Sequence, residues 1–301
     1  MNSAGAAVEV TTGARLHFGP LNWPGPHRTD RPDFGGVGLM IDTPATVVRA
    51  RPSRPDDAID WADARPSLAE AVRRTGQPLP AISIASEATR HVGLGSGTQR
   101  ELAIAAVCGL PRDAKRLASA TGRGRRSAIG VHGFCRGGLL LDGGRPQGEP
   151  LGVLERRIDF PAWPLHLVRL SDRSGLFGPE EAAAFDTLAA MPAATAARLR
   201  QLAEAMFAAV DADSQAAFAA ALTEYGCLVG DFFAPAQGGR FADPQWDELL
   251  PTLEAEGCGL AQSSWGPSVL VVGAFDPALL ADAAFAQPVR ARNDPATITP
   301  R

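Results

Sequence analysis

A glycine-rich turn that runs directly into a helix-forming segment is the feature of this chain best suited to bind an anion. Residues 91–99 read His-Val-Gly-Leu-Gly-Ser-Gly-Thr-Gln, and an alanine-rich apolar segment follows. Glycine allows tight turns that point amides toward a ligand, and a helix start adds unpaired N–H groups and the positive end of the helix dipole. The turn matches neither G-x-x-x-x-G-K-S/T nor G-x-G-x-x-G. It predicts a phosphate site of another kind, with a simple helix-capping turn as the alternative.

An arginine and a histidine at one strand end come shortly before a carboxylate followed by glycines. Arg15 and His17 lie in the sequence Ala-Arg-Leu-His-Phe-Gly, and Asp33 precedes Phe-Gly-Gly. In one cleft these groups would supply a cation, a base and a carboxylate for proton transfer or metal binding. A surface arginine, a core histidine and a turn are the alternative, and the sequence leaves both interpretations open.

Three arginines among glycines form a second candidate anion site. Arg123, Arg125 and Arg126 precede an apolar stretch that carries His132 and that we interpret as a strand over residues 130–134. Guanidinium groups bind phosphate and carboxylate through paired hydrogen bonds. Because Lys115 is the only lysine, anion recognition in this protein falls to arginine. For any single arginine of this group, a solvated basic loop is the alternative.

A polar segment near the C-terminus places Gln262, Ser263, Ser264 and Trp265 between glycines. The Trp265 ring could stack on an aromatic or sugar ring, or it could fill an interface between domains. The chain has no CxxC or HExxH pattern of a zinc site and no G-x-S-x-G nucleophile elbow. We therefore expect this segment to form one wall of a small-molecule site.

Composition limits the classes of protein to consider. The chain has 301 residues, of which 45% are hydrophobic and 21% charged, and its formal net charge is −4. These values indicate a globular, water-soluble protein with no general attraction to nucleic acid or anionic lipid. The four cysteines are isolated, and 18 apolar residues nowhere follow one another. We therefore expect a reduced, cytoplasmic setting without a membrane span.

The candidate residues need a scaffold, and hydrophobic patterning predicts where its elements lie. Strands are expected over 7–12, 38–41, 46–48, 81–85, 130–134, 137–142, 165–170 and 269–275. Helices are expected over 67–74, 97–110, 113–120, 179–190, 193–210, 213–229, 244–257 and 277–285. The Gly- and Pro-rich stretch 143–150 predicts a boundary between domains at 1–150 and 151–290, followed by a mobile tail over 291–301. Strands first and helices later, with a late strand returning, indicate an α+β protein.

Taken together, these segments resemble one family. The similarity is carried by residues 15–19, 33–38, 91–99, 122–134, 137–138 and 262–267, so it extends over most of the chain. They are similar to the corresponding segments of β-ribofuranosylaminobenzene 5′-phosphate synthases, a branch of the GHMP kinase superfamily. The resemblance implies a two-domain α+β fold whose N-terminal domain is like domain 2 of ribosomal protein S5.

The resemblance also implies a reaction. Phosphoribosyl pyrophosphate (PRPP) condenses with 4-hydroxybenzoate or 4-aminobenzoate, losing CO2 and pyrophosphate, to give a C-riboside 5′-phosphate in an early step of tetrahydromethanopterin biosynthesis. It further implies an Mg²⁺-dependent homodimer. Kinases of the superfamily carry Ser-Gly-x-Asp with the aspartate as the proposed base, whereas the equivalent segment from Ser127 to Gly130 ends in glycine. An ATP-dependent small-molecule kinase is therefore the less favoured alternative, and a non-catalytic ligand-binding member of the superfamily is a third.

Roles for individual residues follow from what this reaction requires. Donors arranged around the departing pyrophosphate would stabilise its growing negative charge. We expect Asp33, His17 and His132 to be catalytic and Asp33 and Glu101 to bind Mg²⁺. The expected substrate-binding residues are Arg15, Gly93, Gly95, Ser96, Gly97, Thr98, Gln99, Arg123, Arg125, Arg126, Gln262, Ser263, Ser264 and Trp265.

Overall fold

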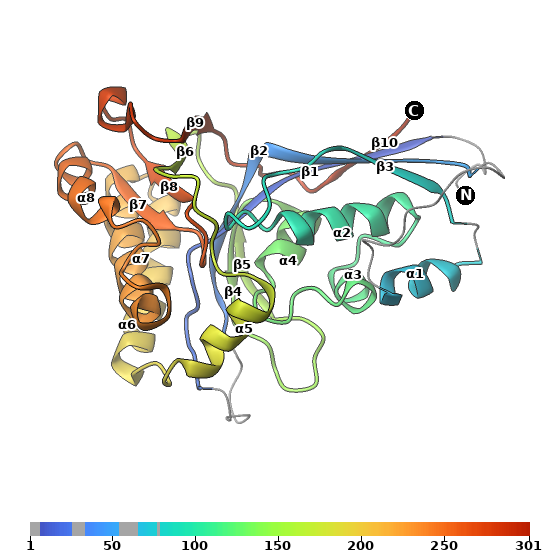
Figure 1. Ribbon diagram of the computed structural model, residues 1–301, viewed down its shortest axis with the longest axis horizontal. Helices are drawn as coiled ribbons and strands as arrows, with labels where there is room; N and C mark the ends of the chain where they lie inside the picture. The colour runs from blue at the N-terminus through green and yellow to red at the C-terminus, as the bar shows by residue number, and fades with distance from the viewer. Residues whose placement is uncertain (1–6, 26–33, 54–65, 77–78) are drawn as a thin grey trace.

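Two antiparallel sheets, each covered by helices, organise the protein (Figure 1). The computed structural model describes residues 7–25, 34–53, 66–76 and 79–301. The larger sheet has the order β10-β1-β2-β4-β5, with β3 also paired to β2, and the smaller sheet has the order β7-β8-β6-β9. The strands of the larger sheet are β1 (Val8–His17), β2 (Gly36–Arg51), β3 (Ala81–Ser86), β4 (Leu139–Asp142), β5 (Leu154–Ile158) and β10 (Thr297–Pro300). Those of the smaller sheet are β6 (Leu165–Arg169), β7 (Gly259–Gln262), β8 (Val269–Val272) and β9 (Phe285–Val289).

The helices fall into two groups, one for each sheet, with one helix between them (Figure 1). One face of the larger sheet is covered by α1 (Pro66–Arg73), α2 (Ser96–Val107), α3 (Ala114–Thr121) and α4 (Ile129–Arg136). The smaller sheet is accompanied by α6 (Ala193–Asp211), α7 (Gln215–Gln237) and α8 (Gln245–Ala255). Helix α5 (Gly178–Thr187) lies where the two halves meet. The predicted α+β fold is thereby confirmed.

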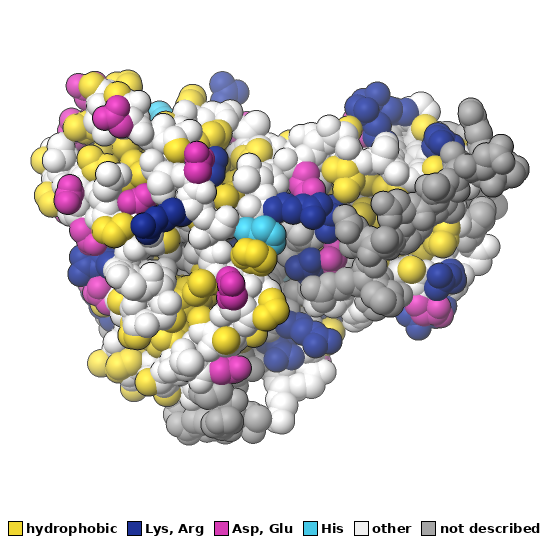
Figure 2. All heavy atoms as spheres, in the orientation of Figure 1, with side chains coloured by type: hydrophobic (Ala, Val, Ile, Leu, Met, Phe, Trp, Pro, Cys, Tyr) yellow, Lys and Arg dark blue, Asp and Glu magenta, His cyan; other side chains and the backbone are white. Residues whose placement is uncertain are grey.

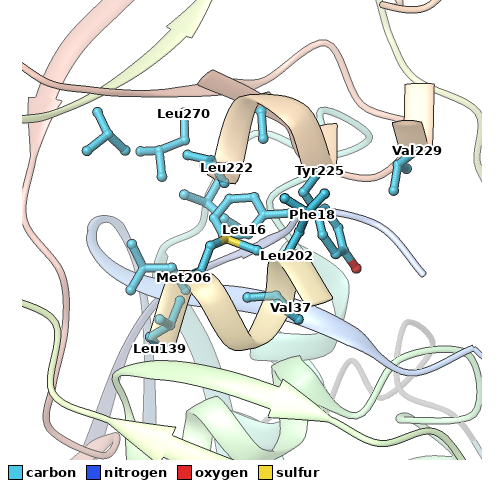
Figure 3. Packing of buried hydrophobic residues seen from close by; sticks show 14 of the residues in the cluster. Leu16, Phe18, Val37, Leu139, Leu202, Met206, Leu222, Tyr225, Val229 and Leu270 are labelled. Atoms are coloured by element: carbon cyan, nitrogen blue, oxygen red, sulfur yellow. The ribbon is translucent and has the colours of Figure 1, made fainter. Parts of the chain in front are cut away.

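One hydrophobic core joins the two halves of the protein (Figure 3). Leu16 of β1 and Phe18, which directly follows the strand, pack in this core with side chains from α6 and α7, among them Met206 and Leu222. Full burial of such a side chain contributes about 1.5–3 kcal/mol. Because side chains of a strand alternate between its two faces, burial of positions 16 and 18 turns positions 15 and 17 to the opposite face. The core thus determines where Arg15 and the histidine after it can lie.

The boundary between the halves differs from the expected break at residue 150. Strands β4 and β5 pair with each other, from Leu139↔Ile158 to Asp142↔Leu154, so the Gly- and Pro-rich stretch 143–150 is a connection within the larger sheet. Residues 291–301, expected to be a mobile tail, include β10, which pairs with β1. Side chains of β10 are exposed. This strand is held by backbone pairing rather than by apolar burial, and hydrophobic patterning could not reveal it.

Two further expectations about secondary structure were wrong, although most helices occur within a few residues of their predicted ranges. The expected strand at 130–134 is part of helix α4, because a short apolar run does not distinguish a buried strand from a buried helix. The expected helix at 277–285 is a 3-10 turn, Pro277–Leu280, that leads into β9. The helix expected over 113–120 is confirmed as α3, and Asp113 is its N-cap, since the Asp113 carboxylate accepts a hydrogen bond from the Arg116 amide.

Helix α7 is long and apolar enough, by length and composition, to cross a membrane. Its apolar side chains are buried in this structure, Phe218 and Leu222 among them, and the helix packs beside α6 and β7. A core helix of a soluble protein has the same composition. We therefore interpret α7 as a core helix.

Candidate active site

A cleft between the glycine turn and α5 contains two adjoining cavities. The outer cavity, of about 400 Å³, runs along the glycine turn, and the inner cavity, of about 280 Å³, extends past Arg15 toward His17. Both are lined by the same six residues where they meet: Arg15, Thr98, Arg123, Arg126, Glu181 and Ser264. In the space-filling view, basic side chains gather beside a histidine in the middle of the molecule (Figure 2). The cleft therefore brings together segments from both halves of the chain.

The glycine turn forms the start of α2, as the sequence predicts. Gly95 is the N-cap residue and has a left-handed conformation with φ 66°. The amides of Thr98 and Gln99 donate to the carbonyl oxygen of Gly95. The amides of Ser96 and Gly97 precede any intrahelical acceptor, so they and the helix dipole can bind an anion in the outer cavity.

Arginines supply the positive charge that lines the outer cavity. Its described residues include Arg15, Arg90, Arg100, Arg123 and Arg126. A cluster of this kind would attract a polyanion such as a diphosphate, because each guanidinium can donate two parallel hydrogen bonds. We expected three of these five residues from the sequence, whereas Arg90 and Arg100 gave no signal beyond their closeness to the turn.

Two carboxylates hold members of this cluster in place. Glu101, in α2, accepts two hydrogen bonds from Arg123, at 2.8 Å to Nε and 2.5 Å to Nη2. Glu181, in α5, lies 2.9 Å from Nη1 of Arg126. Arg123 also lies close to the turn, since a Cβ added to Gly97 would lie 3.3 Å from its Nη2. The two ion pairs therefore tie the arginine loop to α2 on one side and to α5 on the other.

Arg15 is a buried cation with an unused donor. Its Nε is shielded from solvent and has no hydrogen-bond partner among the residues that the structure describes. Burial lowers the pKa of Arg15 to about 10, so the side chain remains protonated at neutral pH. An unpaired buried donor is costly, and an anionic ligand at the junction of the two cavities would supply the missing acceptor.

His17 is a neutral side chain at the inner cavity. It is 6% exposed, and its Nε2 has no partner within the described part of the chain. Burial, and to a smaller extent the charge of Arg15, lower the pKa of His17 to about 3. The imidazole is therefore uncharged at physiological pH. It can form a hydrogen bond with a ligand, but it is a poor proton acceptor.

Aromatic rings form the apolar wall of the inner cavity. Phe34, Phe185 and Phe233 line it, and the first two rings meet edge to face at 5.3 Å between centroids. Trp265, expected to stack on a ligand, lines the outer cavity but is 3% exposed and stacks on Phe233 at 3.9 Å. Its large ring therefore supports the wall more than it offers a free face.

Sequence analysis missed Glu181, Phe185 and Phe233, which come from α5 and α7. The two α5 residues are four positions apart, so they lie on one helix face. That spacing was the one sequence signal for a shared site. Because amphipathic helices commonly show the same spacing, it does not by itself indicate a functional site.

Several residues expected to bind substrate have side chains that make hydrogen bonds within the protein. The Gln99 side chain is fully buried, where it accepts from Thr12 Oγ1 at 2.8 Å and donates to the carbonyl of Gly130 at 2.9 Å. Ser263 Oγ donates to the carbonyl of Gly93 at 2.7 Å, which joins the polar segment to the glycine turn. Gln262 bonds to Ala242, Gln237 and Ser264. The remaining expected residues, Gly93, Gly95, Ser96, Gly97, Thr98, Arg125 and Ser264, line one or both cavities.

Besides His17, the sequence analysis gave catalytic or metal-binding roles to three residues. The described part of the protein places two of them, and neither has a side chain free in the cleft. His132 lies in α4, and its Nε2 donates to the carbonyl of Gly152 at 2.9 Å, so this ring is used within the scaffold rather than in the cleft. Glu101 is held by Arg123, which favours a role in positioning that arginine over the expected role as an Mg²⁺ ligand. Asp33 lies outside the described residues.

The described side chains do not form a metal site of their own. Across residues 7–25, 34–53, 66–76 and 79–301, no group of three or more His, Cys, Asp or Glu side chains could hold a metal ion. Mg²⁺ commonly binds through one or two carboxylates together with substrate phosphates.

Comparison with known proteins points to one kind of relative. No family model matches the sequence. A β-ribofuranosylphenol 5′-phosphate synthase of Archaeoglobus fulgidus is 31% identical over 208 residues, which is 62% of this chain and 64%, just under two thirds, of that protein. One of Methanothermobacter thermautotrophicus is 28% identical over an alignment of 309 positions, which covers 91% of each chain.

Solved structures show which fold the chain has. Mevalonate pyrophosphate decarboxylase of Streptococcus pyogenes superposes with a TM-score of 0.70 at 11% identity and covers 97% of this chain and 99% of its own. Mevalonate-3-kinase of Thermoplasma acidophilum superposes with a TM-score of 0.69 at 11% identity and covers 99% of this chain and all of its own. At such low identity the likeness concerns the fold alone, which is the two-domain fold of the GHMP kinases.

Proposed function

We propose that this chain, which is similar to β-ribofuranosylphenol 5′-phosphate synthases, is a pentosyltransferase that joins PRPP to 4-hydroxybenzoate with loss of CO2 and pyrophosphate. The name of the relatives denotes a phenol product, which favours 4-hydroxybenzoate over 4-aminobenzoate. One observation carries the proposal: a cavity lined by arginines and helix-start amides adjoins a cavity lined by phenylalanines. A polyanionic donor and an aromatic acceptor would need such neighbouring sites.

In this proposal the outer cavity binds the diphosphate of PRPP. The amides of Ser96 and Gly97 and the guanidinium of Arg123 face the negative charge that grows when the bond from ribose C1 to the diphosphate oxygen breaks. The electron pair of that bond leaves with the diphosphate. Each preorganised donor of this kind contributes about 3 kcal/mol to lowering the barrier.

The inner cavity binds the aromatic acid. Its ring would lie against Phe34, Phe185 and Phe233, with the carboxylate toward Arg15 at the junction. The ring carbon that bears the carboxylate forms the new bond to C1, and the pair of electrons from the broken bond to CO2 restores the aromatic ring. His17, neutral in the folded protein, would hold the para-hydroxyl group by a hydrogen bond, since the overall reaction removes no proton from it.

Three further parts of the proposal come from the resemblance. Mg²⁺ would enter as the complex of PRPP, since the described side chains include no cluster of three or more ligands for it. Asp33 would bind Mg²⁺ or stabilise the positive charge that develops on the ribose. The protein would act as a homodimer in the cytoplasm.

A kinase is the less favoured function because the described lining lacks a carboxylate that is free to act as the base. A Cβ added to Gly130 would lie 3.2 Å from Thr98 Cγ2 and 3.7 Å from Arg15 Nε, so an acidic residue at this position would face the cleft. Glycine offers no such group. Among the described residues, Glu181 is the one carboxylate that lines either cavity, and it is paired with Arg126.

Release of labelled CO2 tests the proposal directly. The protein is incubated with Mg²⁺, PRPP and 4-hydroxybenzoate that carries the label in its carboxyl group, and a parallel reaction contains labelled 4-aminobenzoate. We expect CO2 release that depends on PRPP and is faster with the hydroxy acid. A third reaction contains ATP and a panel of alcohols. Phosphorylation of an alcohol without any release of CO2 would favour the kinase instead.

A further inference from the structure

Helix α5 presents an acidic and an aromatic side chain to the same arginine of the opposite half. Glu181 lies 2.9 Å from Arg126 Nη1, and the ring centroid of Phe185, one turn later, lies 6.0 Å from the Cζ of the same guanidinium. Residues four apart share a helix face, so both contacts come from one side of α5. Arg126 is thereby held at the junction of the two cavities by groups that the sequence analysis did not consider.

The surroundings of Glu181 are strongly positive. Arg15, Arg123 and Arg126 line the same two cavities, and each of them attracts its carboxylate electrostatically. Burial acts in the opposite direction and raises the pKa of Glu181 above its ordinary value. A partly buried carboxylate among guanidinium groups occupies the kind of position that a substrate phosphate or carboxylate would occupy.

We propose that Glu181 is an internal counter-ion, which pairs with Arg126 when no anion is bound and gives way when an anionic substrate binds. This inference rests on the proposed function only for the identity of the anions that bind. The counter-ion lowers the affinity of the cleft for anions, and two steps of the reaction benefit. Pyrophosphate can leave after the transfer, and the aromatic carboxylate is not held so firmly that its conversion to neutral CO2 is opposed.

The exchange needs a change of side-chain position but no unfolding of α5. The segment before the helix is fastened to the glycine turn, because Phe177 stacks on His91 at 3.6 Å and the Gly175 amide donates to the His91 carbonyl at 2.8 Å. The segment after the helix is fastened by a hydrogen bond from Trp23 Nε1 to the Leu188 carbonyl. Between these anchors, the Glu181 side chain can rotate away from Arg126.

Binding of inorganic pyrophosphate to the complete protein tests this inference. Calorimetric titrations compare the wild type with E181Q, which removes the charge but keeps the shape, and with E181D, which keeps the charge. The matched control is E180Q, since Glu180 is exposed on the same helix. We expect E181Q to bind pyrophosphate about tenfold more tightly, as loss of one like charge a few ångströms from the anion implies. E180Q and E181D should differ from the wild type by less than about twofold.

Unchanged or weaker binding by E181Q would overturn the inference, since Glu181 would then support the site or contact the ligand through its charge. Thermal unfolding of the four proteins identifies a variant that binds weakly because it has not folded, and E181D then provides the comparison. The result is independent of turnover. Tighter binding by E181Q together with no CO2 release by the wild type would retain the counter-ion and reject the proposed synthase activity.

Discussion

His17 and Arg15 leave β1 on the same face, two positions apart, and the positive charge of Arg15 adds to burial in lowering the pKa of His17 to about 3. The two side chains line the inner cavity together. The arrangement separates their roles, because the arginine carries the charge that attracts an anion and the histidine remains neutral. Because His17 is neutral in the folded protein, its protonation should also affect stability at low pH.

Acid stability should depend on His17. Its pKa is about 3 in the folded protein and about 6.5 in an unfolded chain, so the unfolded state binds the proton first as the pH falls. The free energy of unfolding should therefore decrease between pH 6.5 and 3. Chemical denaturation of H17Q, at pH 4.5 and 7, should show a smaller decrease than the wild type. H91Q, which changes an exposed histidine, should keep the wild-type decrease; an equal decrease in H17Q would contradict the assignment.

Glu101 should act on the donor site through Arg123 and not through a metal. The E101Q variant loses charge from a pair of hydrogen bonds to Arg123, at a cost of about 1–3 kcal/mol in unfolding free energy. We expect the KM for PRPP to rise several-fold, by the order of magnitude of one weakened charged hydrogen bond. The Mg²⁺ concentration for half-maximal activity should not change. A large increase in that concentration would restore Glu101 as a metal ligand.

Gly97 should be needed for binding and not for folding. A Cβ at this position would lie 3.3 Å from Arg123 Nη2, within the anion site. The G97A variant should raise the KM for PRPP about tenfold, while its thermal stability stays the same or increases because alanine favours helix by up to about 1 kcal/mol. The comparison is G93A, where the added Cβ would lie 2.4 Å from the Ser263 carbonyl oxygen at a positive φ. That variant should lose stability, and a wild-type KM in G97A would place the diphosphate elsewhere.

Position 130 should not tolerate a carboxylate. In G130D the new side chain would point toward Arg15 Nε, the buried donor without a partner in the described part of the protein. Pairing with this guanidinium would compete with the substrate, so CO2 release should fall about 100-fold or more, in line with loss of a key electrostatic contact. G130A separates the effect of volume from that of charge and should retain more activity. Wild-type turnover in G130D would remove Arg15 from the proposed site.

Local patterning in the sequence was sufficient for much of the scaffold. The glycine turn that begins α2, the N-cap at Asp113 and the ranges of most helices follow from turn chemistry and periodicity, which act over a few residues. Resemblance over most of the chain predicted the fold before any geometry was known, and it pointed to the same kind of relative that the comparisons found. Alternation along β1 also separates Leu16 from the residues on either side of it.

The tertiary structure decided the contacts between distant segments. Arg126 and Glu181 are 55 positions apart and belong to different halves, so no local pattern could pair them. The same holds for β10, whose exposed residues pair through their backbone with β1 at the other end of the chain. It also holds for the apolar run 130–134, which is helical because of what it packs against. Local sequence determines which elements are favourable, but their shared core determines which side chains meet in the cleft.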